Sequence, residues 1–157
     1  MRKRQLSMPL LESSSSPGTE WLDLETKAVV EVTSEEPDYP VESALISEQR
    51  QGWRAASPGT QTIRLIFDQP QRLKHISVFI EDDQSTRTQE FVLRWSPYNA
   101  SWFREIVRQQ WNFNPEATHE IEEYQCELSD VGVLELVIVP DISGGQARAS
   151  LKRLRIR

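Results

Sequence analysis

Apolar and polar residues alternate in short runs along most of the chain from Trp21 onward. In the run Thr62–Asp68, for example, Ile63, Leu65 and Phe67 occupy every second position. Successive side chains of a β-strand point to opposite faces, so this spacing predicts a strand with one buried face. The same pattern predicts further strands, separated by clusters of Pro, Gly, Asp, Asn and Ser: Lys27–Val32, Leu73–Ile80, Glu90–Ser96, Tyr124–Leu128, Val133–Val139 and Ala149–Ile156.

Three segments have a less regular pattern. Val133–Val139 is apolar except at Glu135, which predicts a central strand covered on both faces. Ala149–Ile156 changes phase once, which predicts a bulge. Asn99–Gln110 comes nearest to a helical period, but its aromatic and β-branched residues suit a strand, and we interpret it as one. About eight strands joined by turns predict an all-β fold, an antiparallel jelly-roll β-sandwich, rather than an α/β enzyme core.

The composition adds a polar tail to this fold. Residues 1–20 contain Arg2-Lys3-Arg4, the serine run Ser13–Ser16 and Pro17-Gly18, and cannot bury enough apolar surface to offset the entropy lost on ordering. We therefore expect a flexible tail over residues 1–20 and one folded domain over residues 21–157. The net charge of −6 repels phosphate backbones, which argues against nucleic acid as the main partner.

Several features bear on the compartment and on metal binding. No segment is apolar over the roughly 20 residues that span a bilayer, and the N-terminus lacks the apolar stretch of a secretory signal. The single cysteine, Cys126, cannot form an internal disulfide, and with His75 and His119 it does not make a structural zinc site. These features predict a cytoplasmic protein without a membrane span.

The order of several short motifs resembles a known family. The motifs are Tyr39-Pro-Val-Glu-Ser-Ala-Leu45, Gly52-Trp-Arg-Ala-Ala-Ser-Pro-Gly59, Glu90-Phe-Val-Leu-Arg-Trp-Ser96 and Leu134-Glu-Leu-Val-Ile-Val-Pro-Asp141. They resemble the discoidin, or coagulation factor 5/8 type C, domains of the galactose-binding-like superfamily. The Trp53-Arg-Ala-Ala segment also resembles the N-terminal domain of the scaffold protein of DNA single-strand-break repair, which has the same fold. The resemblance implies an eight-stranded jelly-roll sandwich.

The resemblance also implies that ligands bind to the loops at one end of the sandwich. In this chain those loops are Ser34–Val41, Ser47–Gln51 and Glu81–Gln89. Many relatives hold a calcium ion through an Asp-Gly pair just after the Ala-Leu of the first loop. This chain reads Ala44-Leu-Ile-Ser-Glu-Gln-Arg50 at that place, with neither Asp nor Gly, so we expect no calcium and no cofactor.

The first loop holds three candidate ligand-binding residues, Glu36, Asp38 and Tyr39. Their carboxylates and aromatic ring can bind sugar hydroxyls, and a tyrosine packed under its own loop is an equal alternative. Trp53, just beyond the second loop, could stack on a sugar or a base. We interpret it as a core residue, because tryptophan is highly buried on average.

The other two loops hold charged candidates. Arg50 in the second loop can bind a carboxylate or a hydroxyl, as can its neighbour Arg54, which can equally brace the end of the sandwich. Asp82, Asp83 and Arg87 in the third loop can bind hydroxyls through charge-assisted hydrogen bonds; alternatively, the acidic cluster can supply oxygen ligands to calcium. A solvated turn is the more frequent role of such a charge run.

The sequence contains none of the common catalytic templates: no Gly-x-Ser-x-Gly, no His-Glu-x-x-His and no phosphate-binding loop. We therefore expect a non-catalytic module that binds a glycan through these loops, with a protein-interaction scaffold as the alternative. Contact with DNA ends is a weaker third hypothesis, because alternation along the last strand would split its basic residues between two faces. Those residues are Arg148, Lys152, Arg153, Arg155 and Arg157.

Overall fold

The structure, a computed structural model, describes residues 20–46, 51–82 and 86–157. The predicted tail therefore lies outside the described residues, except for Glu20. Nearly all regular elements are antiparallel strands, which confirms the predicted all-β class. In chain order the elements are α2 (Leu24–Lys27), β1 (Ala28–Val32), α3 (Glu42–Leu45), β2 (Trp53–Arg54), β3 (Gln61–Glu81), β4 (Arg87–Pro97), β5 (Arg104–Phe113), β6 (His119–Val139), β7 (Ser150–Leu151) and β8 (Arg153–Ile156).

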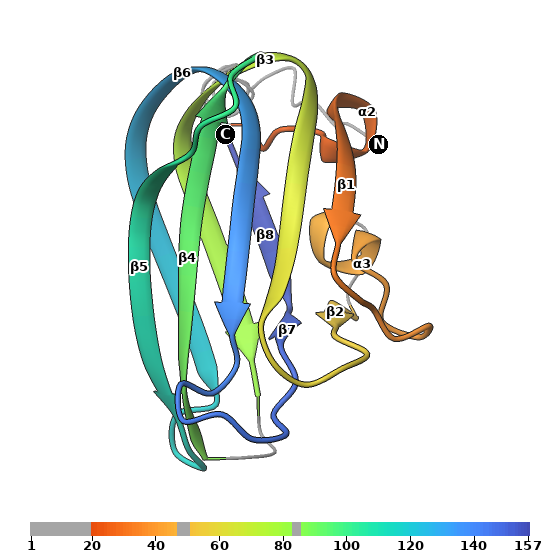
Figure 1. Cartoon of the computed structure of the whole chain (residues 1–157), viewed down its shortest axis with the longest axis vertical. Helices are drawn as coiled ribbons and strands as arrows, with labels where there is room; N and C mark the ends of the chain where they lie inside the picture. Colours follow the sequence, from red (N-terminus) through yellow and green to blue (C-terminus); the bar gives the residue numbers. More distant parts are fainter. Residues whose placement is uncertain (1–19, 47–50, 83–85) are drawn as a thin grey trace, which may run out of the picture.

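Two long strands build both layers of the sandwich (Figure 1). The first half of β3 pairs with β1 and with the second half of β6, and the sheet continues through β4 to β5. The second half of β3 pairs with β8 and with the first half of β6, which forms the second layer. The pairing of β3 with β6 shifts register between Ile66 and His75, where both strands bend from one layer to the other.

The core lies between the two layers. The inward positions of β3, Ile63, Leu65 and Phe67, are at most 3% exposed, as their period of two predicts. Leu136 on β6 and Trp53 on β2 are each 1% exposed, so the interpretation of Trp53 as a core residue is confirmed. Burial of this apolar surface is the main contribution to the stability of the sandwich.

Two pairs of predicted strands are single strands in the structure. The runs Thr62–Asp68 and Leu73–Ile80 both belong to β3, and β6 likewise joins the last two predicted strands before Pro140. The sequence 68–70, Asp-Gln-Pro, indicates a turn, but it lies in the bend of β3, between the paired residues Ile66 and Gln71. Because Pro70 has no ladder partner there, its missing N–H costs no hydrogen bond.

The bend of β6 depends on a close approach of two backbones. Asp130 has a φ of 61°, and a Cβ added to Gly132 would lie 2.6 Å from the Cα of Tyr98. Only glycine allows this contact without displacing the β4–β5 connection. The side chain of Tyr98 reaches across to the bend of β3, where its hydroxyl donates to the carbonyl of Asp68 at 3.1 Å.

Three finer predictions need correction. Strand β5 begins at Arg104, because the turn after Pro97 occupies the start of the predicted segment Asn99–Gln110. The predicted bulge in the last strand is a change of partner: β7 pairs with β2, whereas β8 pairs with β3. Glu135 does not face a covering layer, because its buried carboxylate lies on the outer face of the sheet.

Two arginines bury Glu135. Arg64 on β3 donates from Nε to Glu135 at 2.7 Å, and Arg94 on β4 donates from Nε at 2.8 Å. Arg64 also pairs with Glu31 on β1 at 3.1 Å, so the charges alternate in sign across four neighbouring strands. Cross-strand pairs of opposite charge stabilise a sheet. This row of charged residues lies on the outer face of the first layer and buries Glu135 without an apolar layer above it.

None of the helices formed by the described residues has the length or the apolar character needed to cross a bilayer. The two short helices lie beside the open edges of the sandwich (Figure 1). The small β2–β7 sheet lies at the end of the molecule where β3 stops and β4 starts. This end carries the site described next.

Candidate functional site

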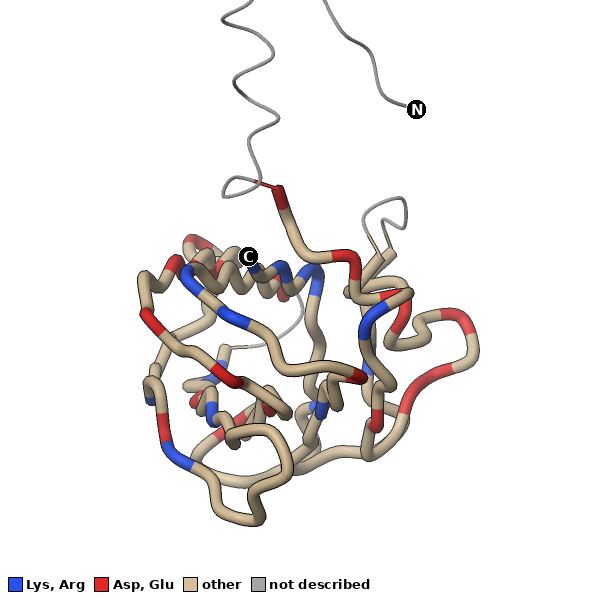
Figure 2. Tube along the Cα trace, turned by 90° about the horizontal axis from the view of Figure 1, so that it is seen from above, with Lys and Arg blue, Asp and Glu red and all other residues tan. Residues whose placement is uncertain are grey.

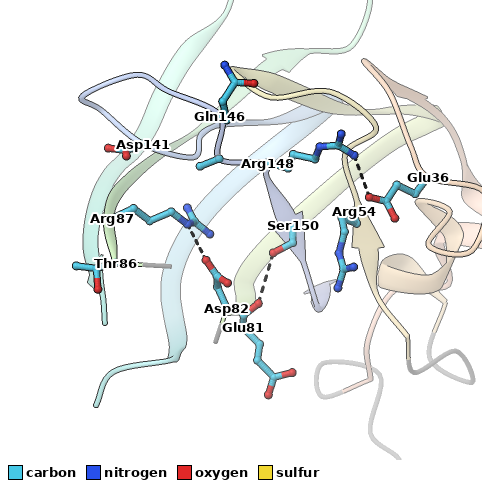
Figure 3. Close-up of a pocket in the computed structure, with 11 residues that line it drawn as sticks. Glu36, Arg54, Glu81, Asp82, Thr86, Arg87, Asp141, Gln146, Arg148 and Ser150 are labelled. Atoms are coloured by element: carbon cyan, nitrogen blue, oxygen red, sulfur yellow. Dashed lines mark hydrogen bonds and ion pairs between the residues drawn. The ribbon is translucent and has the colours of Figure 1, made fainter. Parts of the chain in front are cut away.

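An open pocket of about 880 Å³ lies at the end of the sandwich beside the β2–β7 sheet. Its walls come from four parts of the chain that are far apart in sequence: the loop before α3, β2, the adjoining ends of β3 and β4, and the segment from Asp141 to Ser150 (Figure 3). The lining side chains are almost all polar: Glu36, Arg54, Glu81, Asp82, Thr86, Arg87, Asp141, Gln146, Ala147, Arg148 and Ser150. We refer to this site as the end pocket.

Main-chain hydrogen bonds hold the walls of the end pocket in place. The N–H of Glu36 donates to the carbonyl of Arg54 at 2.8 Å, and the N–H of Arg54 donates to the carbonyl of Tyr39 at 3.2 Å. The loop before α3 therefore runs beside β2 like an extra strand. On the other side, the N–H of Ala55 donates to the carbonyl of Ala149 at 2.9 Å, which fixes the segment that carries Arg148. The pocket is thus built on paired backbone, which positions side chains well.

Arg87 is the most buried charged side chain of the end pocket, with 2% of its side chain exposed. Its Nε donates to Asp82 at 2.7 Å, and its Nη1 donates to the carbonyl of Pro140 and, at 3.3 Å, to Gln89. The guanidinium also lies 4.6 Å from the centre of the Phe113 ring. The remaining nitrogen, Nη2, is buried and has no hydrogen-bond acceptor among the described residues.

A buried carboxyl group, that of Glu120, lies behind Arg87. Gln89 donates from Nε2 to Glu120 Oε1 at 3.0 Å, so one amide bridges Arg87 and Glu120. Burial, and to a lesser extent the nearby Glu122, raise the pKa of Glu120 to about 8, although Gln89 and Arg87 act in the opposite direction. Glu120 is therefore mostly protonated at neutral pH, and its Oε2 has no described partner.

The carboxylates around the end pocket are already engaged. Glu36 accepts from Arg148 at 3.3 Å, and Glu81 pairs with His119 at 2.6 Å, on the outer side of β3. Asp141 accepts from the hydroxyl and the N–H of Ser143, and these bonds lower its pKa. The side chains that remain to bind a ligand are therefore mainly hydrogen-bond donors.

Arg54 and Tyr39 connect the end pocket to a smaller neighbour. The Arg54 guanidinium lies 4.1 Å from the centre of the Tyr39 ring, so it covers one face of the aromatic ring. Tyr39, Arg54, Glu81 and Ser150 also line an adjacent pocket of about 180 Å³. Trp53 lies below this pocket and donates from its indole N–H to the carbonyl of Ser34 at 2.9 Å.

The structure brings several of the predicted site residues together. Glu36, Asp82 and Arg87, predicted from loops that are far apart in sequence, line the same pocket. Tyr39 lies in the adjacent pocket. Asp38 is exposed in the same loop and lines neither pocket. Arg50 and Asp83 lie outside the described residues.

Sequence reasoning missed one side of the end pocket. Asp141, Gln146 and Arg148 come from the segment after β6, of which we named only Arg148 as a candidate, among the basic residues of the DNA hypothesis. The available signal was the alternation of Arg148 and Ser150 with buried Ala149 and Leu151, which places the first two on one face. Without the position of β7 beside β2, that face could not be assigned to the pocket.

The basic residues of the DNA hypothesis divide into two groups. Arg148 lies in the end pocket, whereas Arg153 and Arg155 lie together on the outer face of β8. Burial and the neighbouring charge of Arg153 lower the pKa of Arg155, so these two residues are close. Arg153 and Arg155 share a face because they are two positions apart, and Arg148 is separated from them. Acidic and basic residues nevertheless lie on all sides of the sandwich (Figure 2).

No group of three His, Cys, Asp or Glu side chains within residues 20–46, 51–82 and 86–157 is arranged to hold a metal ion. The segment of the implied calcium site, Ala44–Arg50, lies partly outside the described residues. Our expectation for calcium therefore stays a prediction.

Comparison with known proteins identifies the class and then the family. The fold is that of the galactose-binding-like modules. A family model described as the XRCC1 N terminal domain matches residues 22–123, so the chain belongs to that family. This agrees with the resemblance seen around Trp53-Arg-Ala-Ala. No curated protein matches the chain.

Solved structures with the same fold include three carbohydrate-binding modules. The family 32 module of NanJ from Clostridium perfringens, in complex with galactose, is 12% identical with a TM-score of 0.63, over 87% of this chain and 96% of that one. A second Clostridium perfringens module, in complex with GalNAc-β-1,3-galactose, is 17% identical with a TM-score of 0.61, over 87% and 99% of the two chains. The module of AlyQ, in complex with 4,5-unsaturated mannuronic acid, is 15% identical with a TM-score of 0.61, over 88% and 98%. At these identities the likeness establishes the shared fold.

Proposed function

We propose that this chain is a non-catalytic carbohydrate-binding module and that the end pocket is its binding site. The observation that carries the proposal is the pocket itself: four parts of the chain that are far apart in sequence contribute polar side chains to one open pocket of about 880 Å³. This volume lies within the range of small-ligand sites, roughly 300–1,000 Å³. The solved carbohydrate-binding modules of the same fold support this choice of ligand class.

The side chains of the end pocket suit hydroxyl-rich ligands. Arg54, Arg148 and Gln146 present N–H donors, and the hydroxyls of Thr86 and Ser150 can both donate and accept. Sugar hydroxyls also do both, so they can match such a mixed set. Stacking plays a smaller part, because Arg54 already covers one face of Tyr39. A shallow, polar and open site of this kind predicts weak binding.

Affinity electrophoresis tests this proposal, because gels that contain a soluble polysaccharide detect weak binding. Neutral galactan and acidic polygalacturonate provide the two probes. We expect at least one of them to retard the protein, and we expect Arg54→Gln to remove most of the retardation. Arg72→Gln is the matched control, since Arg72 is exposed in the bend of β3, at the other end of the sandwich. Unchanged mobility in both gels would contradict the proposal.

A protein-interaction scaffold is the second candidate function. The match to the XRCC1 N terminal domain family favours it. The Trp53-Arg-Ala-Ala segment resembles the N-terminal domain of a repair scaffold protein, and that resemblance is consistent with a scaffold role. The outer face of the first layer offers an exposed surface, on which Val29 is 56% exposed beside the charged row of Arg64 and Glu135. A pull-down with the folded domain tests this candidate. Recovery of a stoichiometric partner that Val29→Glu no longer binds would support it.

A further inference from the structure

The end pocket contains a buried cation with an unused hydrogen bond. Arg87 has 2% of its side chain exposed, and three of its five N–H groups, one on Nε and two on Nη1, donate to Asp82, Gln89 and the carbonyl of Pro140. Nη2 has no acceptor among the described residues. In Figure 3 the guanidinium of Arg87 points into the pocket, toward the side that Arg148 and Gln146 line. A buried donor without a partner is costly and is rare in proteins.

Two more guanidinium groups line the same pocket. Arg54 has no carboxylate partner among the described residues, and its guanidinium stacks on Tyr39. Arg148 uses one nitrogen, Nη1, in its ion pair with Glu36, which leaves its other donors for a ligand. Three arginines from β2, β4 and the segment before β7 therefore surround one space.

Four carboxylates, those of Glu36, Glu81, Asp82 and Asp141, also line the pocket, and each is bound to a partner within the protein; the partner of Glu36 is Arg148. Asp82 is turned to Nε of Arg87, Glu81 to His119, and Asp141 to Ser143. Each carboxylate thus faces a partner within the protein. A ligand in the pocket therefore meets the N–H donors of three arginines. The ligand group that matches these donors best is one that has hydrogen-bond acceptors and no donors.

We infer that the end pocket binds an acidic saccharide, whose carboxylate lies over Arg87 between Arg54 and Arg148. This inference rests on the proposed function and names the class of sugar. A carboxylate has about four acceptor positions and no donor, so it can take Nη2 of Arg87 and still bind a second guanidinium. Hydrogen bonds to a charged acceptor are roughly twice as strong as those between neutral groups. A uronic acid is therefore preferred over the neutral sugar of the same configuration.

Calorimetric titration with matched sugars tests the inference. The two pairs are galacturonic acid with galactose, and glucuronic acid with glucose, so that each comparison changes only the carboxylate. We expect the Kd of the acid to be lower by about tenfold or more in at least one pair. We also expect added salt to weaken the binding of the acidic sugar and to leave the binding of the neutral sugar unchanged, because salt screens only the charged contact.

Variants locate the preference within the pocket. Arg87→Lys retains a positive charge but loses the planar group that carries Nη2, so we expect the two Kd values of a pair to converge. Arg54→Gln should also reduce the preference for the acidic sugar. Because this variant retains Arg87, it provides the test if Arg87→Lys does not fold. Arg72→Gln changes the net charge equally at the far end of the sandwich and should retain the full preference.

The outcomes separate the inference from the proposed function. Equal Kd values for acid and neutral sugar would overturn the inference and leave the carbohydrate-binding function intact. No binding of any sugar, with no retardation in the gels, would overturn both. Acetate that binds as tightly as the uronic acid would overturn the assignment to a saccharide. A preference that survives in both Arg87→Lys and Arg54→Gln would show that the acid binds elsewhere and would also overturn the inference.

Discussion

Arg87 and Asp82 form an ion pair, with Nε donating to the carboxylate at 2.7 Å, that joins the start of β4 to the end of β3. Both side chains are largely buried, with 2% and 13% exposed. The pair therefore has two roles in our account: it stabilises the end of the sandwich, and it orients the guanidinium that the ligand meets. The first role can be measured without any ligand.

Replacement of Arg87 by Met should lower the free energy of unfolding by about 2–4 kcal/mol, because the carbonyl of Pro140, Gln89 and Asp82 all lose a buried donor. Denaturant unfolding followed by tryptophan fluorescence measures this change. Arg72→Met is the control, since Arg72 and its partner Glu127 are both exposed and should contribute less than about 1 kcal/mol. Equal effects of the two substitutions would contradict the buried role of Arg87.

Glu120 makes the stability depend on pH. Its pKa in the folded protein, about 8, lies above the ordinary value of 4.5, so the folded state holds a proton that the unfolded state releases. Stability is therefore lost as pH rises through the window between these two values. Glu120→Gln, which cannot ionise, should be more stable than the original protein at pH 9, by an amount on the order of 2 kcal/mol. The difference should shrink toward zero near pH 5.

The control for this prediction is Glu116→Gln, because Glu116 is exposed in the β5–β6 turn. Its unfolding free energy should follow that of the original protein at each pH. A stability difference for Glu120→Gln that does not change with pH would show that Glu120 does not titrate in this window.

The buried carboxylate of Glu135 joins three strands through Arg64 and Arg94. Glu135→Ala leaves two arginines without their shared partner, but each is about two-fifths exposed and can bind water. The cost should therefore be about 1–3 kcal/mol, less than for a fully buried pair. Thermal unfolding measures it, and Glu127→Ala provides the exposed control. A change of midpoint no larger than in the control would contradict the role of this charged row.

Truncation of the core should have a larger effect. Phe67→Ala and Leu136→Ala each remove a side chain that is at most 3% exposed, and each should cost about 2–5 kcal/mol. Ile121→Ala removes a side chain of similar chemistry that is 60% exposed on the outer face of β6. Its effect should be much smaller in the same denaturant titration. Equal costs would show that the buried faces have been assigned incorrectly.

The strands could be predicted because their buried faces repeat with a period of two, as at Ile63, Leu65 and Phe67. The way in which these runs join into longer strands could not be predicted. Pro70 and Gly132 indicate turns in the sequence, but both lie in bends of continuous strands, because a missing N–H or a close backbone approach is tolerated there. Local sequence gives no measure of whether a chain turns back or passes from one layer to the other.

The site was predicted only where a loop follows a recognisable strand. Glu36, Asp82 and Arg87 could be named in this way, and they do line one pocket. Arg148 could not, because its position depends on the pairing of β7 with β2, a contact between segments about 100 residues apart. The burial of Arg87 was also unforeseen, since a charge run between two strands more often lies in solvent.

The most direct test of the carbohydrate-binding account is the location of the response in an amide NMR titration with galacturonic acid and galactose. We predict that the shifted amides belong to residues of the end pocket, including Arg54, Thr86, Arg87 and Ser150. The amides of the β4–β5 connection, which contains Trp102 and lies at the opposite end of the sandwich, should stay unchanged. Shifts confined to the Trp102 end, or spectra that do not change at millimolar sugar, would contradict it.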